Sequence, residues 1–387
     1  MYSTKFMKKK VLIYPFSNKF FPLMKAMINK ADEYEIVSVV TPKTWFLARE
    51  NDDVSKINNS NPLGISISNN FEEEIKKCDT VIIADCNNEK LMYSHIVQKI
   101  RNSIELNKNI ICCFKLDNKD FLEINELCKR NNIKFEYLNE RDKSDEDIDI
   151  LKRQIVNNYT KIYKPDSTII FVGKLLDELE STFSLVSISE NYKKEGYNVV
   201  TISLNSNCRI LDYLSFPNFI FELNISIEEK IFMFNFFIRQ IEIEYKPDLI
   251  IVQLPGGMMK YSDIITNGFG IYPYLISQAI SSDYFVLVAP LDEIDKEFYE
   301  KISECFWHRF GFKIDVVNML NATLDISYSM EKHKVILNYL PIQNVDKIIS
   351  KKFEESKIPV FNPLNNTDCE KMFRASISTL TKYVSIV

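Results

Sequence analysis

A strand, a glycine, a short loop and a helix follow one another in the middle of the chain, and together they can bind phosphate. The apolar run Thr168–Val172 predicts the strand, and Gly173 follows it directly. Backbone N–H groups of such a loop, and of the helix after it, can cradle phosphate oxygens. Lys174 adds a positive charge, and Ser181 and Thr182 add hydroxyl groups near the start of the helix. Gly173 and these three side chains are therefore candidate ligand-binding residues.

The loop itself lacks the residues that phosphate binding requires. Counted from Gly173, the pattern GxxxxGK[ST] would place its second glycine at Glu178 and its lysine at Leu179. Its hydroxyl would fall at Glu180. Carboxylates repel a triphosphate, and Lys174 lies too early in the loop to replace the missing lysine. A nucleotide cofactor is therefore disfavoured, and no other cofactor is indicated.

A second apolar strand, Leu249–Gln253, ends in a Pro-Gly-Gly sequence that includes Gly256 and Gly257. With the preceding loop, this order of segments resembles the ATP-binding domains of the dethiobiotin-synthetase and MinD type. The resemblance implies an acidic residue at the strand end, where it would help hold Mg²⁺. Gln253 stands there, and a neutral amide cannot replace that charge for a hard cation. The sequence thus predicts a P-loop-like fold without intact nucleotide motifs.

A further glycine-rich stretch lies at Thr266–Tyr272 and contains Asn267, Gly268 and Gly270. The glycines allow close backbone approach, and the helix expected after them could offer N–H groups to an anion. Two interpretations remain open: the glycines make only tight turns, or they line a ligand site with Gln253.

Other catalytic patterns are missing. The three histidines have no metal-ligand spacing, and we expect His308 to be a packed or half-exposed side chain of an aromatic helix. No GxSxG, HExxH or CxxxCxxC pattern is present, so the sequence predicts no metal site and leaves the catalytic residues unknown. The eight cysteines include no CxxC pair and are expected to be buried, except Cys208 in a polar loop.

The elements that would position these residues indicate an α/β protein with two domains of parallel sheet. In residues 1–160, β-branched runs alternate with amphipathic stretches, which predicts a Rossmann-like sheet. The expected strands are Val11–Tyr14, Glu35–Val40, Thr80–Ala84, Asn109–Phe114 and Ile133–Tyr137. The expected helices are Phe20–Asn29, Asn70–Lys77, Lys90–Leu106 and Asn118–Asn131. No GxGxxG turn follows the first strand, and Trp45 is expected to pack on Phe46.

The charged run Asn139–Asp149 predicts a linker, and we place the domain boundary near residue 160. Residues 161–387 then form the P-loop-like domain. Besides the two strands named above, its expected strands are Asn198–Ser203, Tyr284–Val288 and Lys334–Tyr339. Its expected helices are Phe183–Glu195, Ile227–Tyr245, Ile271–Ser281, Asp292–Phe310, Val345–Ser356 and Asp368–Tyr383.

The composition restricts the class of partner. The formal charge of −5 is spread along the chain, whereas nucleic-acid binding needs a concentrated basic surface. No stretch approaches the roughly 20 apolar residues of a membrane span, and the apolar run after Met1–Lys10 is too short for a signal peptide. We therefore expect a cytoplasmic protein that binds neither nucleic acid nor membrane.

Several segments resemble one protein family over nearly the whole chain. They are KKKVLIYPF at Lys8–Phe16, YEIVSVVTPKTW at Tyr34–Trp45, CDTVIIAD at Cys78–Asp85, NIICCFKL at Asn109–Leu116, QLPGGMMKY at Gln253–Tyr261 and TNGFGIYPY at Thr266–Tyr274. The family is the peptide maturation system protein encoded beside Clo7bot-type Cys-rich peptide precursors in clostridia. The resemblance implies a ribosomally made precursor peptide and neighbouring maturation enzymes as partners, among them a radical-SAM enzyme.

Three functions are consistent with the sequence. The first is an accessory maturation factor that binds a precursor peptide or a modifying enzyme. The second is a nucleotide-dependent ligase or kinase-like enzyme that uses an altered phosphate site with Lys174, Ser181 and Thr182. The third is a structural homo-oligomer whose exposed aromatic side chains form its interfaces.

Overall fold

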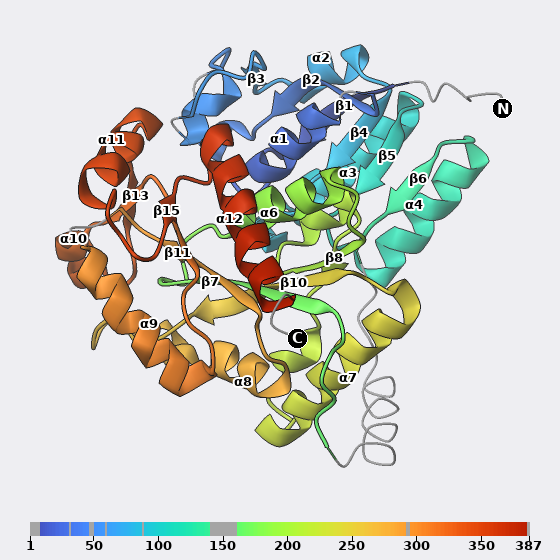
Figure 1. Cartoon of the computed structure of the whole chain (residues 1–387). Helices are drawn as coiled ribbons and strands as arrows, with labels where there is room; N and C mark the ends of the chain where they lie inside the picture. The colour runs from blue at the N-terminus through green and yellow to red at the C-terminus, as the bar shows by residue number, and fades with distance from the viewer. Residues whose placement is uncertain are drawn as a thin grey trace. The chain divides into compact units, whose positions relative to one another are not determined.

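The computed structural model describes residues 8–30, 32–45, 50–58, 60–86, 89–139, 161–291 and 295–384. The chain forms two compact units, each built on a parallel sheet (Figure 1). The first unit comprises Met1–Arg141 with Asn205–Tyr213, and the second comprises Asp142–Leu204 with Leu214–Val387. The predicted α/β class with two parallel sheets is therefore confirmed. The predicted boundary near residue 160 lies outside the described residues, as does the linker from residue 140 onward.

The first unit contains a six-stranded parallel sheet in the order β3-β2-β1-β4-β5-β6. Its strands are β1 (Lys9–Tyr14), β2 (Tyr34–Val40), β3 (Ile67–Ser68), β4 (Thr80–Ile83), β5 (Asn109–Cys112) and β6 (Phe135–Tyr137). Five of them were predicted, and the two-residue β3 is too short to give a sequence pattern. The strand order reverses between β1 and β4, as it does in Rossmann-like sheets.

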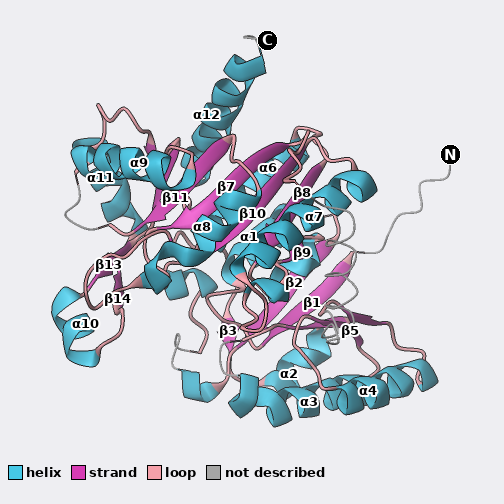
Figure 2. Ribbon diagram, turned by 90° about the horizontal axis from the view of Figure 1, so that it is seen from below, coloured by secondary structure: helices cyan, strands magenta, loops and turns pink. Residues whose placement is uncertain are grey.

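Helices α2 (Phe71–Glu74), α3 (Glu89–Glu105) and α4 (Asn118–Arg130) lie along one face of this sheet (Figure 2). Leu12 and Tyr14 of β1 point into the core that these helices cover. The alternate residue Val11 is buried on the opposite face, as the two-residue period of a strand requires. Helix α1 (Phe21–Asn29) contacts β2, and Trp45 packs against the α2–α4 core.

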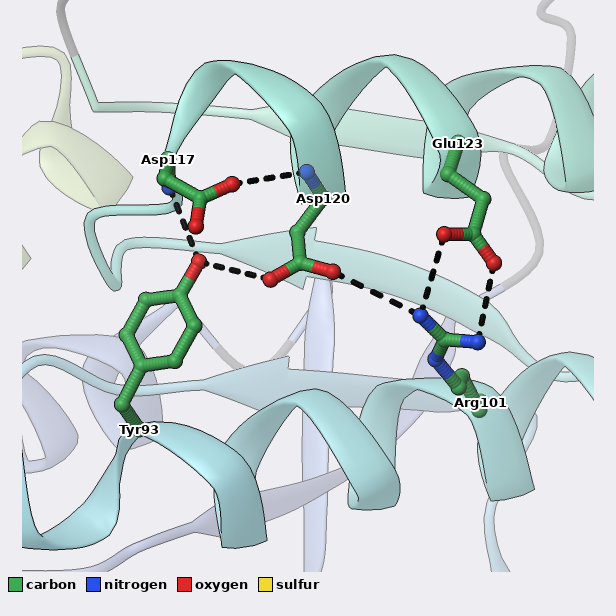
Figure 3. Close-up of polar contacts among 5 residues, drawn as sticks. All are labelled: Tyr93, Arg101, Asp117, Asp120 and Glu123. Atoms are coloured by element: carbon green, nitrogen blue, oxygen red, sulfur yellow. Dashed lines mark hydrogen bonds and ion pairs between the residues drawn. The ribbon is translucent and has the colours of Figure 1, made fainter.

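A polar network joins α3 to α4 on the first unit (Figure 3). The Tyr93 hydroxyl donates to Asp120 at 2.9 Å and accepts from the Asp117 N–H at 2.9 Å. Asp117 caps α4 by accepting from the Asp120 N–H, and Arg101 pairs with Glu123 at 2.8 Å. Burial, and after it the Asp120 carboxylate, raise the pKa of the Tyr93 phenol. The network fixes how the two helices pack and leaves no reactive group in it.

The second unit contains a seven-stranded parallel sheet in the order β15-β12-β11-β7-β10-β8-β9. Its strands are β7 (Thr168–Lys174), β8 (Val199–Ser203), β9 (Leu214–Ser215), β10 (Leu249–Gly257), β11 (Tyr284–Ala289), β12 (Val316–Met319) and β15 (Val360–Phe361). The central strands β7, β10 and β11 are mostly apolar and buried because helices cover both faces.

Two sets of helices cover this sheet. Helices α7 (Ile227–Tyr245), α8 (Ile271–Ala279), α9 (Lys296–Phe310) and α11 (Ile342–Lys352) contribute to one large core with alternate residues of the strands. Helices α6 (Thr182–Lys194) and α12 (Asn366–Val384) pack together, and the Tyr192 and Ser376 hydroxyls hydrogen-bond at 2.8 Å. No helix in the described parts of the chain is long and apolar enough to span a membrane.

The strand predicted at Lys334–Tyr339 does not join the parallel sheet. The strand there is β14 (Leu337–Tyr339), and it pairs antiparallel with β13 (Ala322–Leu324) in a separate two-stranded sheet flanking α10 (Ile326–Lys332). The parallel sheet is instead completed by β12 and β15 at one edge and by β9 at the other, none of which the sequence predicts. β12 follows α9 after a short loop, and the two residues of β15 are too few to show a period.

Asp315, just before β12, gives a test of this packing. Its carboxylate accepts from the Phe285 N–H at 2.8 Å, and burial raises its pKa from 3.8 to about 6. Between the unfolded and folded pKa values the folded state binds more protons, so this group lowers the unfolding free energy as pH rises through that window. We expect the stability of Asp315→Asn relative to the native chain to fall by about 2 kcal/mol between pH 7.5 and 4.5. Urea denaturation at both pH values measures this difference, and a constant difference would contradict the raised pKa.

Candidate functional site

Gln253 lies at the centre of the polar residues that end the strands of the second unit. Its side chain is 4% exposed and uses both ends of its amide. Nε2 donates to the Ser181 hydroxyl at 2.9 Å. Oε1 accepts from the Ser203 hydroxyl at 2.9 Å and from the Leu204 N–H at 2.8 Å. Gln253 lies within β10, where the regular pairing with β7 ends, and it thus joins this strand and the end of β8 to the residue before α6.

Gln253 and Ser181 contact each other directly, without a metal ion between them. In P-loop NTPases, Mg²⁺ lies between a loop serine or threonine hydroxyl and an acidic residue. In this chain the two side chains hydrogen-bond directly, and the amide donates where a cation would need an acceptor. No group of His, Cys, Asp and Glu side chains in the described ranges could hold a metal ion.

The N-terminus of α6 already holds a carboxylate. Glu180 Oε1 accepts from the Thr182 N–H at 2.9 Å. Helix N-termini favour negative charge, so this carboxylate satisfies a group that would otherwise face a phosphate. The Thr182 hydroxyl is buried, and it has no hydrogen-bond partner in the part of the chain that the structure describes.

Lys174 does not face open solvent at the loop. Its ammonium pairs with the Asp177 carboxylate at 2.9 Å and also donates to the Asp177 carbonyl. The loop carries three carboxylates, those of Asp177, Glu178 and Glu180, and one ammonium group, that of Lys174. Loss of water around its carboxyl, and then the Asp177 charge, raise the pKa of Glu178. The one ammonium group of the loop is therefore already paired with a carboxylate of the same loop.

Asn267 fastens the loop from the other side. Its Nδ2 donates to the Leu175 carbonyl at 3.0 Å and to the Met259 carbonyl at 2.8 Å. Its Oδ1 accepts from the Asp177 N–H at 3.2 Å. A Cβ atom at Gly257 would lie 2.5 Å from the Asn267 side chain, so the glycine there is what lets the asparagine enter. The Asp177 N–H is a donor that a phosphate oxygen could otherwise accept from, and here Asn267 occupies it.

The Thr266–Tyr272 stretch contains four consecutive residues in the left-handed region. The φ angles of Asn267, Gly268, Phe269 and Gly270 are 50°, 58°, 56° and 65°. This conformation costs an L-residue about 1–2 kcal/mol and is rare beyond single positions. The Arg309 guanidinium donates to the Phe269 carbonyl at 2.5 Å, and this bond helps to hold the turn.

The left-handed turn places apolar side chains at the surface. Phe269 is 52% exposed, and Ile271 and Tyr274 at the start of α8 are 49% and 42% exposed. Because about half of Phe269 is exposed, burial of its side chain does little to offset the cost of its left-handed conformation. Strained residues of this kind cluster at functional sites.

The structure brings together most of the residues that the sequence singled out. Lys174 ends β7, Gln253 of β10 contacts Ser181 before α6, and Asn267 contacts the loop between β7 and α6. Gly173, Gly257 and Gly270 are close-contact glycines, since an added Cβ atom would approach Met258 or Asn267 within 3 Å. Gly256 and Gly268 have positive φ and no atom closer than 3.9 Å to an added Cβ, so the turn conformation, and not close packing, favours glycine there.

Sequence reasoning missed the roles of Glu180 and Ser203. Glu180 was noted only as an unfavourable charge, whereas it caps α6. Ser203 becomes visible once β8 and β10 are known to be neighbours in register, with Ile202 beside Val252. Cys208 was expected to be the exposed cysteine, but it is fully buried, and the exposed one is Cys305 on α9. His308 is exposed in the last turn of α9.

The chain is similar to several solved structures over different shares of its length. A DUF1611 family protein from Anabaena variabilis matches with a TM-score of 0.54 and 8% identity, over 96% of this chain and 100% of that chain. A putative oxidoreductase from Bacteroides fragilis matches with a TM-score of 0.27 and 14% identity, over 49% and 52%. A GTPase from Pyrococcus abyssi matches with a TM-score of 0.27 and 12% identity, over 55% and 97%.

The DUF1611 likeness spans both units and shows a shared fold. No known protein-family profile matches the sequence, and neither does any curated protein.

Replacing Gln253 with leucine removes both ends of the central hydrogen-bonded bridge. The Leu204 N–H and the two serine hydroxyls then lose a buried partner, and each such loss costs about 1–3 kcal/mol. We expect Gln253→Leu to lower the unfolding free energy by about 3 kcal/mol in urea denaturation. Gln278→Leu is the matched control, because Gln278 is exposed on α8 and should change stability by less than about 0.5 kcal/mol. Equal effects of the two changes would contradict the role of the bridge.

The left-handed turn predicts opposite tolerance at its two glycines. An alanine Cβ at Gly270 would lie 2.1 Å from the Met258 carbonyl oxygen, whereas Gly268 has no atom within 4 Å. Both positions have positive φ, so each alanine carries a conformational cost of about 1 kcal/mol. Gly270→Ala should lose at least about 2 kcal/mol more than Gly268→Ala, since backbone must move. Thermal and urea unfolding of both variants measure the difference.

Proposed function

We propose that this chain is an accessory factor in the maturation of a ribosomally synthesised peptide, and that it binds the precursor peptide or a modifying enzyme without hydrolysing nucleotide. The resemblance of the segments at Lys8–Phe16 and Thr266–Tyr274 supplies the peptide-maturation context. The second unit supplies the physical argument for binding without hydrolysis.

The observation that carries the proposal is the Gln253–Ser181 hydrogen bond. It joins two neutral side chains where the P-loop resemblance implies ligands of Mg²⁺. Glu180 accepts from the Thr182 N–H at the start of α6, and Asn267 accepts from the Asp177 N–H of the loop. A nucleotide would have to break all three sets of bonds and then meet three carboxylates. The arrangement therefore favours a rigid binding surface over a turnover site.

The binding surface that we propose is the exposed apolar side of the left-handed turn, made of Phe269, Ile271 and Tyr274. Aromatic side chains are enriched at the centres of protein interfaces because they bury a large area with few rotatable bonds. The turn holds Phe269 at the surface in a strained conformation, which a purely structural turn would not need.

A second candidate function is a nucleotide-dependent ligase or kinase-like enzyme with an altered phosphate site. The buried Thr182 hydroxyl favours it, because this group lies in the first residue of α6 and has no partner within the described residues. Such an enzyme would need Glu180 to leave the helix N-terminus and Lys174 to leave Asp177.

Phe269→Asn separates binding from stability. Asparagine adopts the left-handed region more readily than phenylalanine, so the variant should be as stable as the native chain or about 0.5–1 kcal/mol more stable. It should also lose at least tenfold in affinity for the precursor peptide encoded beside the gene, or for the modifying enzyme, in pull-down and surface plasmon resonance. Ile243→Ser is the control, because Ile243 is 59% exposed on α7 and away from the turn in sequence. Unchanged binding by Phe269→Asn would rule out this surface.

Calorimetry with Mg-ATP and Mg-GTP distinguishes the two candidate functions. The accessory-factor proposal predicts no saturable heat up to about 1 mM nucleotide. Saturable micromolar binding that disappears in Ser181→Ala would overturn the proposal and favour the enzyme.

A further inference from the structure

The first unit has an edge at which open α/β sheets bind ligands. Ligands of such sheets lie outside the carboxyl ends of the strands, where the strand order reverses. Here that point lies between β1 and β4, so residues 15–20 and 84–86 follow the two strands. The segment Asn205–Tyr213, which belongs to the first unit, hydrogen-bonds to both loops. We call it the switch-point segment.

At the β4 side, the segment binds Asp85 through three hydrogen bonds. Asn207 Oδ1 accepts from the Asp85 N–H at 2.6 Å, and its Nδ2 donates to the Asp85 carbonyl at 3.2 Å. The Asn207 side-chain amide thus binds both the backbone N–H and the backbone carbonyl of Asp85, as a residue of an added strand would. The Ser206 hydroxyl donates to the Asp85 carboxylate. Asn207 is fully buried, so this contact is an enclosed one.

At the β1 side, the segment makes a weaker fit. Asn205 Nδ2 donates to the Lys19 carbonyl at 2.9 Å. The neighbouring Ser17 Oγ and Asn18 Oδ1 atoms are buried, yet neither has a hydrogen-bond partner among the residues that the structure describes. Buried polar atoms without partners are unfavourable, so an occupant that supplied the missing donor and acceptor would bind this loop better.

We propose that this edge of the first unit is a peptide-recognition site, that the switch-point segment occupies it in cis, and that a partner peptide with Asn and Ser side chains at the same spacing binds there in its place. The contacts define the ligand class. They take a side-chain amide, a hydroxyl and a second amide, which a polar peptide supplies. The Asp85 carboxylate would repel a dinucleotide phosphate, and the loop after β1 has no GxGxxG turn.

Because the switch-point segment is part of the same chain, it competes strongly with any added peptide for this site. A tethered segment acts at an effective concentration on the order of millimolar, so a peptide in trans sees an affinity reduced by the fraction of sites that are open. Breaking the cis contacts should therefore raise the apparent affinity of an added peptide. This site is independent of the surface around Phe269, and its test does not depend on the peptide-maturation proposal.

The test uses the full chain and a fluorescent synthetic peptide that spans residues 203–214 and carries Cys208→Ser. We expect the double variant Ser206→Ala/Asn207→Ala to bind this peptide at least tenfold more tightly than the native chain in fluorescence anisotropy. Adding Asp85→Ala to the double variant should reduce the gain only in part, because it removes the carboxylate that Ser206 binds and keeps the backbone groups that Asn207 binds. Asn218→Ala, at an exposed position outside the segment, should leave the affinity at the native value.

Labelling of the Cys208 thiol measures release of the segment. This thiol is fully buried, so maleimide should modify it slowly in the native chain and faster in the double variant, as located by peptide mapping. Millimolar unlabelled peptide added to the native chain should also speed its modification at least threefold, which needs no variant to fold. Tight binding by the double variant, or this acceleration, supports a recognition site. If the peptide neither accelerates labelling nor binds a folded double variant, the segment is a structural strap and the proposal is overturned.

Discussion

The Gln253 side chain is the contact on which the second unit depends. It satisfies a hydroxyl before α6, a hydroxyl at the end of β8 and the Leu204 N–H at once. A carboxylate at this position would carry charge into a buried setting and would need a cation to balance it. A neutral amide that both donates and accepts needs no cation. The buried Gln253 amide is therefore satisfied by groups of the protein alone.

Other polar groups around the loop also bind partners within the protein in place of an external ligand. Glu180 supplies the negative charge that α6 favours at its N-terminus, and Asp177 neutralises Lys174. Asn267 binds loop groups on both its donor and acceptor sides. Each contact is modest alone, but together they leave the loop closed on itself. The turn Asn267–Gly270 differs from these contacts, because its left-handed conformation is unfavourable and leaves Phe269 exposed.

The first unit shows a related arrangement with a chain segment in place of side chains. Its strand order creates the usual ligand edge between β1 and β4, and residues 205–213 of the same chain occupy that edge. Both units therefore keep the shape of ligand-binding α/β folds while their own groups fill the places where ligands would bind.

The amino-acid sequence by itself determined the α/β class, most strands and helices, and the electrostatic defect of the loop. β-branched runs and helical periodicity report burial locally, and the acids at Glu178 and Glu180 repel phosphate in any fold. The tertiary structure alone decided what those polar residues bind instead. Neither the Gln253–Ser203 contact nor the Asn207–Asp85 contact leaves a local pattern, because each joins residues at least 50 positions apart. For the same reason Cys208 is buried although its neighbours in sequence are polar: burial depends on which distant elements pack over a residue.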